Sequence, residues 1–277
     1  MPKNNSEKYT MDESLSLKIT DLSINFGGLK AVDGLSIDVK KNEIFGLIGP
    51  NGAGKTTAFN CITQFYHPDR GEVLFRTKQG NVVNLVGRNT HDIIKLGLVR
   101  TFQNVEVIKE LSLLENVLLG AHIDFKATIF EQALCLPRAR REERELREKA
   151  AEGLRFMGIE ALKDAKAGGQ PYGVLKKVET ARTLMCEPSL IILDEPAAGL
   201  NDSETAELTE IIRNIRDAYD CTILLVEHDM HLVMNVCERI CAISFGEFLA
   251  CGTPEEIQAN ALVQEAYLGE KEFKGGE

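Results

Sequence analysis

The sequence has no strongly basic segment and no excess of positive charge. Its 32 Lys and Arg residues are outnumbered by 42 Asp and Glu residues, which gives a formal net charge of −10. No basic patch is interleaved with aromatic residues. Because proteins bind nucleic acid through clustered Lys and Arg that neutralise phosphates, nucleic acid is not an expected partner.

The chain also lacks a long hydrophobic run. No apolar stretch approaches the ~20 residues that a helix needs to cross a bilayer. The polar segment 1–14 has none of the features of a signal peptide and is predicted to be a disordered tail. These absences predict a cytoplasmic protein, which another chain must hold in place if it works at a membrane.

Metal-binding and redox patterns of cysteine are missing as well. The cysteines form no Cys-x-x-Cys pair and no spacing typical of a zinc site. Most lie within apolar runs, which is typical of buried free thiols in a reducing compartment. The seven residues are Cys61, Cys135, Cys186, Cys221, Cys237, Cys241 and Cys251.

What the sequence does contain is a phosphate-binding motif. Residues 49–57, Gly-Pro-Asn-Gly-Ala-Gly-Lys-Thr-Thr, fit the pattern of a glycine, four residues and then Gly-Lys-Ser/Thr. An apolar run at 44–48 precedes the motif and a helix-compatible run at 56–63 follows it, which is the context that the motif requires. The N–H groups of such a loop and of the helix N-terminus point at the phosphates of a nucleotide.

Individual roles follow for the residues of this motif. Lys55 is expected to reach the β- and γ-phosphates, and the Thr56 hydroxyl is expected to bind Mg²⁺. The alternative is a strand-to-helix turn that is rich in glycine for steric reasons alone. The residues expected to contact the nucleotide are Asn51, Gly52, Ala53, Gly54, Lys55, Thr56 and Thr57.

Apolar runs and helical patterns alternate along the chain. The period-two pattern of residues 15–39, around a turn at 26–29, predicts antiparallel strands beside the nucleotide site. Continuous apolar runs at 190–193 and 222–226, joined by a helix at 204–219, are typical of parallel strands buried on both faces. The predicted fold class is therefore α/β, with a P-loop NTPase parallel sheet core, an antiparallel β subdomain and an inserted helical subdomain.

Weaker patterns complete this outline. Residues 91–98 are helix-like, and further strands are predicted at 240–243 and 248–251, followed by a helix to about residue 268. The insertion carries helices at 113–122 and 138–157, and another helix is predicted at 174–185. The helix predicted at 138–157 has an apolar stripe on one face and pairs of opposite charges, four residues apart, on the other. The charged face is interpreted as solvated and not as a binding site. The stripe is Leu146, Ala150, Leu154 and Met157, and the pairs are Arg138 with Glu142, Arg141 with Glu145, and Glu143 with Arg147.

Polar residues follow several of the predicted strands and are expected to meet at one edge of the sheet. Asp194 and Glu195 follow the run 190–193, where an Asp holds Mg²⁺ and the next Glu polarises a water for attack on the γ-phosphate. His228 follows the run 222–226, where it is placed to bond the γ-phosphate and orient that water. Acidic residues also end strands at solvent, a lone His is often structural, and a lone Gln such as Gln103 is usually solvated. Phe26 is placed to stack on adenine, with a core or turn phenylalanine as the equal alternative.

Taken in order, these motifs resemble those of the ATP-binding cassette (ABC) ATPases of transporters, over nearly the whole of residues 15–269. The resemblance assigns 49–57 as Walker A, Gln103 as the Q-loop, 190–194 with Glu195 as Walker B, 198–201 as the D-loop, His228 as the switch histidine and Phe26 as the A-loop aromatic. Segments 26–32, 99–104, 195–201 and 266–269 are similar to those of the branched-chain amino-acid importer subgroup. Of its two ATPase subunits, the longer, G-type one is the more similar.

The resemblance implies a function and a set of partners. It implies one ABC ATPase domain at 15–268 with an insertion at about 102–168 and a C-terminal tail at 269–277. ATP and Mg²⁺ are the implied cofactors, with Thr56, Gln103 and Asp194 at the metal and Glu195, His228 and Gln103 in catalysis. The implied partners are a second ATPase subunit, integral-membrane permease subunits that hold the chain at the inner face of the membrane, and a separate substrate-binding protein.

One segment departs from the family pattern. Where the family has Leu-Ser-Gly-Gly-Gln or Leu-Ser-Tyr-Gly-Gln, residues 170–174 read Gln-Pro-Tyr-Gly-Val. In the family this segment closes over ATP bound to the other subunit, and Pro171 has neither the hydroxyl nor the N–H of the serine. A heterodimer with one strong and one weak site is therefore expected rather than a homodimer, unless Pro171 is only a good first residue for the following helix.

Other functions remain as alternatives. One alternative is an ABC ATPase of the same type that powers lipopolysaccharide export or the import of urea, amides or aromatic compounds. This alternative stays open because the permease and the binding protein, and not the ATPase, select the cargo. A soluble ABC protein of DNA repair or translation needs a long coiled coil, a tandem cassette or basic surfaces, none of which the sequence contains. A nucleotide-binding regulator without turnover is disfavoured by Glu195 and His228.

Overall fold

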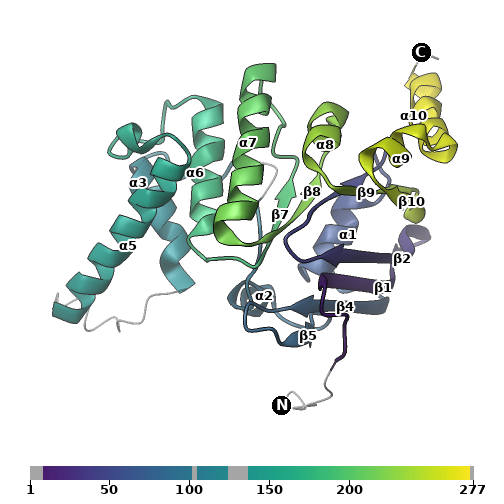
Figure 1. The fold of residues 1–277 in the computed structure, drawn as a ribbon, viewed down its shortest axis with the longest axis horizontal. Helices are drawn as coiled ribbons and strands as arrows, with labels where there is room; N and C mark the ends of the chain where they lie inside the picture. Colours follow the sequence, from purple (N-terminus) through teal and green to yellow (C-terminus); the bar gives the residue numbers. More distant parts are fainter. Residues whose placement is uncertain (1–8, 102–104, 124–136, 275–277) are drawn as a thin grey trace.

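The computed structural model describes residues 9–101, 105–123 and 137–274 of the chain. Six strands form its central sheet in the order β10-β9-β3-β8-β7-β6 (Figure 1). The strands of this sheet run parallel except in the antiparallel β9–β10 hairpin. Their bounds are Ile44–Ile48 (β3), Leu98–Arg100 (β6), Leu190–Asp194 (β7), Thr222–Val226 (β8), Arg239–Ser244 (β9) and Glu247–Gly252 (β10).

Both faces of the central sheet are covered. Every residue of β3, β7 and β8 is buried, as the continuous apolar runs predict. On one face, Ile44 and Ile48 belong to a core that includes residues of α7 (Asp202–Tyr219) and α8 (Met230–Val236). On the other face, Phe45 packs with α1 (Lys55–Ile62) and the second sheet. The predicted α/β architecture is confirmed.

The second sheet is antiparallel and has the order β2-β1-β4-β5. Its first two strands pair from Leu15 to Lys40 around the turn between Phe26 and Leu29, which confirms the antiparallel pair predicted for residues 15–39. Arg76 donates hydrogen bonds to the carbonyl oxygens of Met11 and Asp12, so this part of the predicted tail is bonded to β4. The bounds are Leu15–Phe26 (β1), Leu29–Lys40 (β2), Arg70–Arg76 (β4) and Val82–Asn84 (β5).

The helical subdomain lies at the far side of the central sheet from the antiparallel sheet (Figure 1). Its longest helix, α5, buries the predicted stripe, with the exposed fraction of Leu146 at 9% and those of Ala150 and Leu154 at 0%. On its solvent face, Arg141 pairs with Glu145 at 2.8 Å and Arg147 with Glu143 at 3.1 Å, as predicted. The elements are α3 (Leu113–Leu118), η1 (Leu119–Ile123), α5 (Pro137–Phe156), η2 (Glu160–Leu162) and α6 (Tyr172–Leu184).

Several predicted boundaries are wrong. Helix α7 begins at Asp202, two residues before the predicted start at 204, and the helix predicted at 113–122 is α-helical only over α3, with a 3-10 turn after it. The helix-like segment 91–98 divides into α2 (Thr90–Lys95) and strand β6, because Gly97 takes a φ of +99° and ends the helix. Helix α6 begins at Tyr172, two residues earlier than predicted. After α9 (Pro254–Ala259), helix α10 runs from Ala261 to Lys274, beyond the predicted end near residue 268.

The part of the chain that the structure describes contains no helix with the length and apolar character needed to cross a membrane.

Candidate nucleotide and catalytic site

The loop between β3 and α1 has the shape that its glycines predict. Gly54 is the N-cap of α1 with φ +96°, and a Cβ atom there would lie 2.3 Å from the carbonyl oxygen of Ala31. A Cβ atom on Gly49 would likewise lie 2.3 Å from the carbonyl oxygen of Ile243. Both contacts are shorter than any side chain tolerates, so the close approach of β2 and β9 requires glycine at both positions. This is the steric role that the alternative of a glycine-rich turn assigns to them, and the binding role depends on the residues that surround the loop.

Lys55 lies inside this loop. Its Nζ donates hydrogen bonds to the carbonyl oxygens of Gly49 at 2.6 Å and Pro50 at 3.0 Å. The residue is only 7% exposed although it carries a charge. The ammonium group and the positive end of α1 therefore lie at the same concavity, where both favour an anion.

One pocket of about 350 Å³ brings most of the predicted site together. It is lined by residues 51–57, by Phe26 at the end of β1, and by Glu195 after β7. Phe26 is 46% exposed and meets the ring of Tyr66 edge-to-face, with 5.3 Å between the centroids. It is a turn residue at the pocket rather than a core residue, and its contact with adenine stays a prediction.

Four pocket residues were missed by sequence reasoning: Leu29, Lys30, Ala31 and Phe245. The first three follow the β1–β2 turn, and their proximity to Phe26 was a usable signal. Phe245 follows β9 and lies far from every motif in the sequence, so no local pattern pointed to it.

Asp194 ends β7 and forms a buried ion pair with Arg100 on β6. The Oδ2 atom of Asp194 lies 2.6 Å from Nη2 of Arg100, and Nη1 of Arg100 donates to Oδ1 of Asn60 on α1 at 2.7 Å. The side chains of both Asp194 and Arg100 are 7% exposed. Sequence reasoning did not identify Arg100, which balances the charge of the carboxylate proposed for the metal.

Glu195 and His228 lie near each other at the ends of β7 and β8. Glu195 takes a left-handed φ of +46°, and its N–H donates to the carbonyl of Val226 at 2.9 Å. A non-glycine residue in this region is strained, and such strain is common at catalytic positions. Nδ1 of His228 lies 3.8 Å from Oε1 of Glu195, too far for a hydrogen bond, and the imidazole is 57% exposed.

The buried side chain of Glu227 links the two loops that carry Glu195 and His228. Its side chain is 0% exposed, and its carboxylate accepts hydrogen bonds from the N–H groups of Ala197 at 2.7 Å, His228 at 3.0 Å and Asp229 at 3.2 Å. Burial raises the pKa of Glu227, and these three bonds act in the opposite direction. One buried carboxylate thus joins the loop after Glu195 to the loop that carries His228.

The segment that departs from the family pattern begins helix α6. Pro171 is its N-cap residue with φ −55° and ψ 148°, and its carbonyl accepts from the N–H of Val174 at 3.0 Å. The alternative for Pro171 was that it serves only as the first residue of the helix. In the structure Pro171 precedes the first helical residue, Tyr172. A Cβ atom on Gly199 would lie 3.1 Å from the ring of Tyr172, so this ring rests on the loop after β7.

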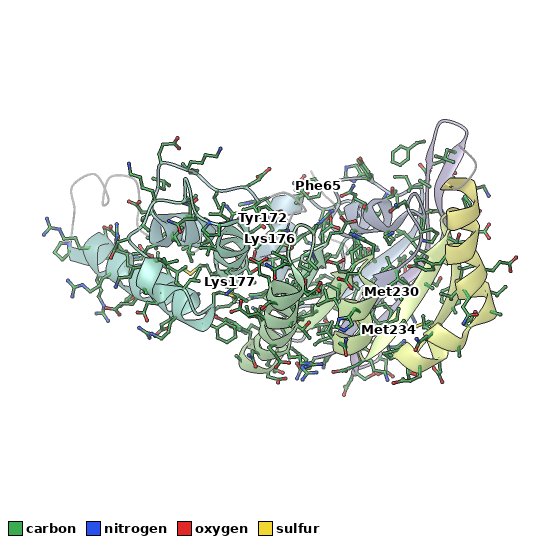
Figure 2. All side chains as sticks on the ribbon, turned by 90° about the horizontal axis from the view of Figure 1, so that it is seen from above. Phe65, Tyr172, Lys176, Lys177, Met230 and Met234 are labelled. Carbon is green, nitrogen blue, oxygen red and sulfur yellow. The ribbon has the colours of Figure 1, made fainter. Side chains whose placement is uncertain are left out.

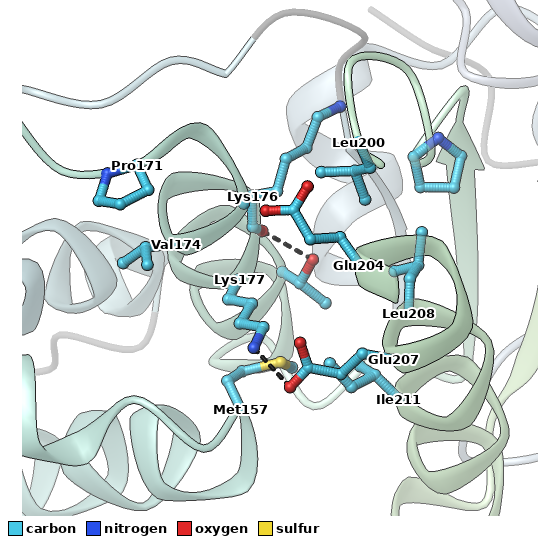
Figure 3. Close-up of a pocket in the computed structure, with 13 residues that line it drawn as sticks. Met157, Pro171, Val174, Lys176, Lys177, Leu200, Glu204, Glu207, Leu208 and Ile211 are labelled. Atoms are coloured by element: carbon cyan, nitrogen blue, oxygen red, sulfur yellow. Dashed lines mark hydrogen bonds and ion pairs between the residues drawn. The ribbon is translucent and has the colours of Figure 1, made fainter. Parts of the chain in front are cut away.

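Lys176 lies one turn along α6, with Nζ 5.7 Å from the centroid of the Tyr172 ring, and Figure 2 labels both residues. Burial lowers the pKa of Lys176, while Glu179 and the carboxylates at the ends of β7 and β8 act in the opposite direction. A second, smaller pocket between α6 and α7 is shown in Figure 3, where Lys177 pairs with Glu207 at 2.6 Å. The ion pair between Lys177 and Glu207 therefore joins α6 of the helical subdomain to α7 of the central core.

Gln103 lies outside the described residues, so its predicted roles at the metal and in catalysis stay predictions. Thr101 and Val105 are the described residues on either side of it, and the N–H of Thr101 donates to the carbonyl of Ile192 at 2.9 Å. The chain is therefore held beside β7 up to two residues before Gln103.

Comparison with known proteins agrees with this fold. Residues 32–198 match the family described as ABC transporter, and residues 249–272 match the family described as branched-chain amino acid ATP-binding cassette transporter. The chain belongs to the ABC transporter family, and it is an ATP-binding cassette ATPase. The predicted family and enzyme class are confirmed.

Particular relatives share most of its length. The chain is 42% identical over 254 residues to the high-affinity branched-chain amino acid transport ATP-binding protein LivG of Escherichia coli, which covers 92% of this chain and 98% of LivG. It is equally similar, over the same shares, to BraF of Pseudomonas aeruginosa, which bears the same description. Among solved structures, the ADP conformation of MJ1267, an ATP-binding cassette of an ABC transporter, superposes with a TM-score of 0.78 at 31% identity, covering 94% of this chain and 100% of MJ1267.

Proposed function

We propose that this chain binds MgATP over residues 49–57 and, as one half of an ATPase dimer, hydrolyses it to drive the import of branched-chain amino acids. The observation that carries the proposal is that the phosphate-binding loop and Glu195 line one and the same pocket. The cargo is supported by the relatives, which are named as branched-chain amino acid transport proteins.

The phosphates of ATP lie against the N–H groups of the loop and the ammonium of Lys55. The ammonium is held within the loop by the carbonyls of Gly49 and Pro50, beside the positive end of α1, and both favour the charge of the phosphates. Glu195, held at the rim of this pocket, accepts a hydrogen bond from the attacking water and aligns it with the γ-phosphate. His228, beside Glu195, donates to the γ-phosphate oxygen and fixes the direction of attack.

The residues also fit Mg²⁺. Thr56 and Asp194 offer hydroxyl and carboxylate oxygens, the ligand type that Mg²⁺ prefers, and Gln103 is the further proposed ligand. Among the described residues, His, Cys, Asp and Glu form no group of three that would hold a metal alone. Beside a nucleotide, Mg²⁺ is held by a few protein oxygens together with the substrate phosphates. When bound, Mg²⁺ neutralises charge on the transferring phosphate.

The partners follow from the absence of the family serine at Pro171. The chain's own residues for binding and hydrolysis are complete, whereas its segment 170–174 has fewer groups to offer to a partner's ATP. A heterodimer with a second ATPase subunit is therefore proposed, seated on integral-membrane permease subunits at the inner face of the membrane and served by a separate substrate-binding protein.

The test uses the complex reconstituted in liposomes with its permease and binding protein. The intact complex is expected to hydrolyse ATP faster and to accumulate leucine, isoleucine or valine when those amino acids are supplied. Glu195→Gln is expected to reduce ATP turnover by at least roughly a hundredfold while ATP binding is retained. Stimulation by urea, amides or aromatic compounds instead of these amino acids would reassign the cargo, and unchanged turnover in Glu195→Gln would refute the mechanism.

The heterodimer has its own test. The purified chain alone is expected to show low ATPase activity per site, and addition of the partner subunit is expected to raise it. Equal rates per site in the two samples would contradict the asymmetry. Pro171→Ser is the matched variant, since it restores the hydroxyl and N–H and is expected to raise the activity of the chain alone.

A further inference from the structure

The tip of the β9–β10 hairpin is fixed against the phosphate-binding loop. The N–H of Gly246 donates to the carbonyl of Ala53 at 2.9 Å, and the carbonyl of Gly246 accepts from the N–H of Asp33 at 2.9 Å. A Cβ atom on Gly246 would lie 2.8 Å from the carbonyl oxygen of Ala31. The backbone at this tip is therefore held between the loop and β2.

The side chain just before Gly246 is in an unfavourable position for a phenylalanine. Phe245 has a left-handed φ of +48°, and it is 87% exposed. Bulky residues rarely adopt this conformation, and a water-exposed aromatic ring forgoes the stabilisation that burial provides. An Asn or Gly would suit the turn better, so strain and exposure together point to a role for the ring beyond folding.

Phe245 is one of the residues that line the nucleotide pocket. Phe26 and Leu29, which are 46% and 68% exposed, line the same pocket from the β1–β2 turn. The phosphate-binding loop forms the polar part of this pocket, and it accounts for the phosphates of ATP. The apolar side chains remain for the part of ATP that has aromatic, apolar faces, which is the adenine base.

We propose that Phe245 contacts the base of bound ATP, so that apolar side chains from two separate hairpins hold the adenine. This inference rests on the proposed nucleotide site and adds a residue from β9–β10 to it. Stacking between a base and an aromatic side chain contributes enough to change affinity by about five- to a hundredfold. Since the ring is fixed to the loop by the backbone of Gly246, base and phosphates are bound by one connected unit.

The experiment compares two ligands on the full-length chain by isothermal titration calorimetry. Phe245→Asn removes the ring but keeps a residue that accepts the left-handed conformation. We expect it to weaken MgATP binding by at least about fivefold and to leave the binding of magnesium tripolyphosphate, which has no base, unchanged. Phe245→Tyr keeps the ring and is expected to bind both ligands as the wild type does.

A matched control is available on the same hairpin. Phe248 on β10 is 48% exposed and is not among the residues lining the pocket, so Phe248→Asn is expected to change neither affinity. Equal weakening of both ligands by Phe245→Asn would overturn the proposal and assign the ring to support of the loop. Unchanged binding of both ligands, with weaker ATP-dependent association with the partner subunit, would overturn it in favour of a subunit contact. Failure of wild-type chain to bind either ligand would instead refute the nucleotide site itself.

Discussion

Arg100 and Asp194 form an ion pair of 2.6 Å in which each side chain is 7% exposed. The pair joins β6, from which the chain leads toward Gln103, to the strand end that carries the proposed metal ligand. Arg100 also bonds to Asn60 on α1 at 2.7 Å. One guanidinium therefore links three elements around the nucleotide site.

Removal of this guanidinium is the first prediction. Arg100→Gln leaves a buried carboxylate without its cation, and breaking a buried pair in this way costs roughly 3–5 kcal/mol in the free energy of unfolding. Urea denaturation followed by circular dichroism measures the loss. The control is Arg213→Gln, because Arg213 pairs with Glu210 at 2.6 Å in an exposed position on α7, where such a pair contributes about 0–1 kcal/mol. Equal losses in the two variants would contradict the importance given to burial.

The contacts of Arg100 also mark the limit of sequence reasoning. The loop 49–57 and the strands at 190–194 and 222–226 were predictable because their signals are local: a spacing, or a continuous apolar run. Arg100 and Asp194 lie 94 positions apart, and no local pattern in either segment predicts that the two side chains pair. Phe245 reaches the pocket only because parallel pairing places β9 beside β3. The helix predicted at 91–98 failed for a different reason, since Gly97 allows a turn that the apolar pattern does not reveal.

The second prediction concerns the close approach of β2 to the loop. Gly54→Ala places a Cβ atom 2.3 Å from the carbonyl of Ala31 and requires an alanine at φ +96°. The variant is expected to lose roughly 1–3 kcal/mol in the free energy of unfolding from backbone strain alone, and to bind ATP weakly because the loop must move. Thermal unfolding and calorimetric titration with ATP measure the two effects. In Gly28→Ala, the control, the added Cβ has no atom within 4 Å, and both properties are expected to stay near wild type.

The third prediction concerns Glu227 in catalysis. Glu227→Gln replaces one carboxylate oxygen by an NH₂ group that faces backbone N–H donors, so either Ala197 or the loop of His228 loses its acceptor. Because Glu227 is not among the residues lining the nucleotide pocket, we expect kcat to fall by roughly ten- to a hundredfold with little change in ATP affinity. Steady-state ATPase kinetics of the assembled complex give kcat, and titration with ATP gives the affinity. A variant that lost affinity and kept kcat would contradict the positioning role. The control is Glu210→Gln on the exposed face of α7.

The same substitution gives a prediction on pH. The folded-state pKa of Glu227 is raised by burial, so the native protein holds a proton that the unfolded chain, with a glutamate pKa of about 4.3, has already released. Stability contributed by this group therefore falls as the pH rises from about 4.3 through the folded pKa, because the unfolded state binds fewer protons. The difference in the free energy of unfolding, wild type minus Glu227→Gln, is expected to grow as the pH is lowered across this window. Urea denaturation of both proteins at a series of pH values measures this difference. The contributions of the other carboxylates to the pH dependence are the same in both proteins and drop out of it. A difference that shrinks toward low pH would show that the pKa of Glu227 is lowered instead.

The last prediction concerns two thiols at the base of the β9–β10 hairpin. Cys241 and Cys251 are directly opposite each other in the antiparallel register, and Nη2 of Arg239 lies 3.5 Å from the sulfur of Cys251. The Cys241 thiol and the Arg239 guanidinium lower the pKa of Cys251, against the effects of burial and of Glu43. The usual pKa of a thiol is about 8.5. The rate at which iodoacetamide alkylates Cys251 is therefore expected to reach half its maximum at a pH below this value, as followed by peptide mass spectrometry. Arg239→Gln is expected to move this midpoint to higher pH. Arg213→Gln, which changes a residue on α7 and not on the hairpin, is expected to leave the midpoint unchanged. A midpoint at or above 8.5 in the wild type would mean that the negative charge of Glu43 and the partial burial of the sulfur outweigh the guanidinium.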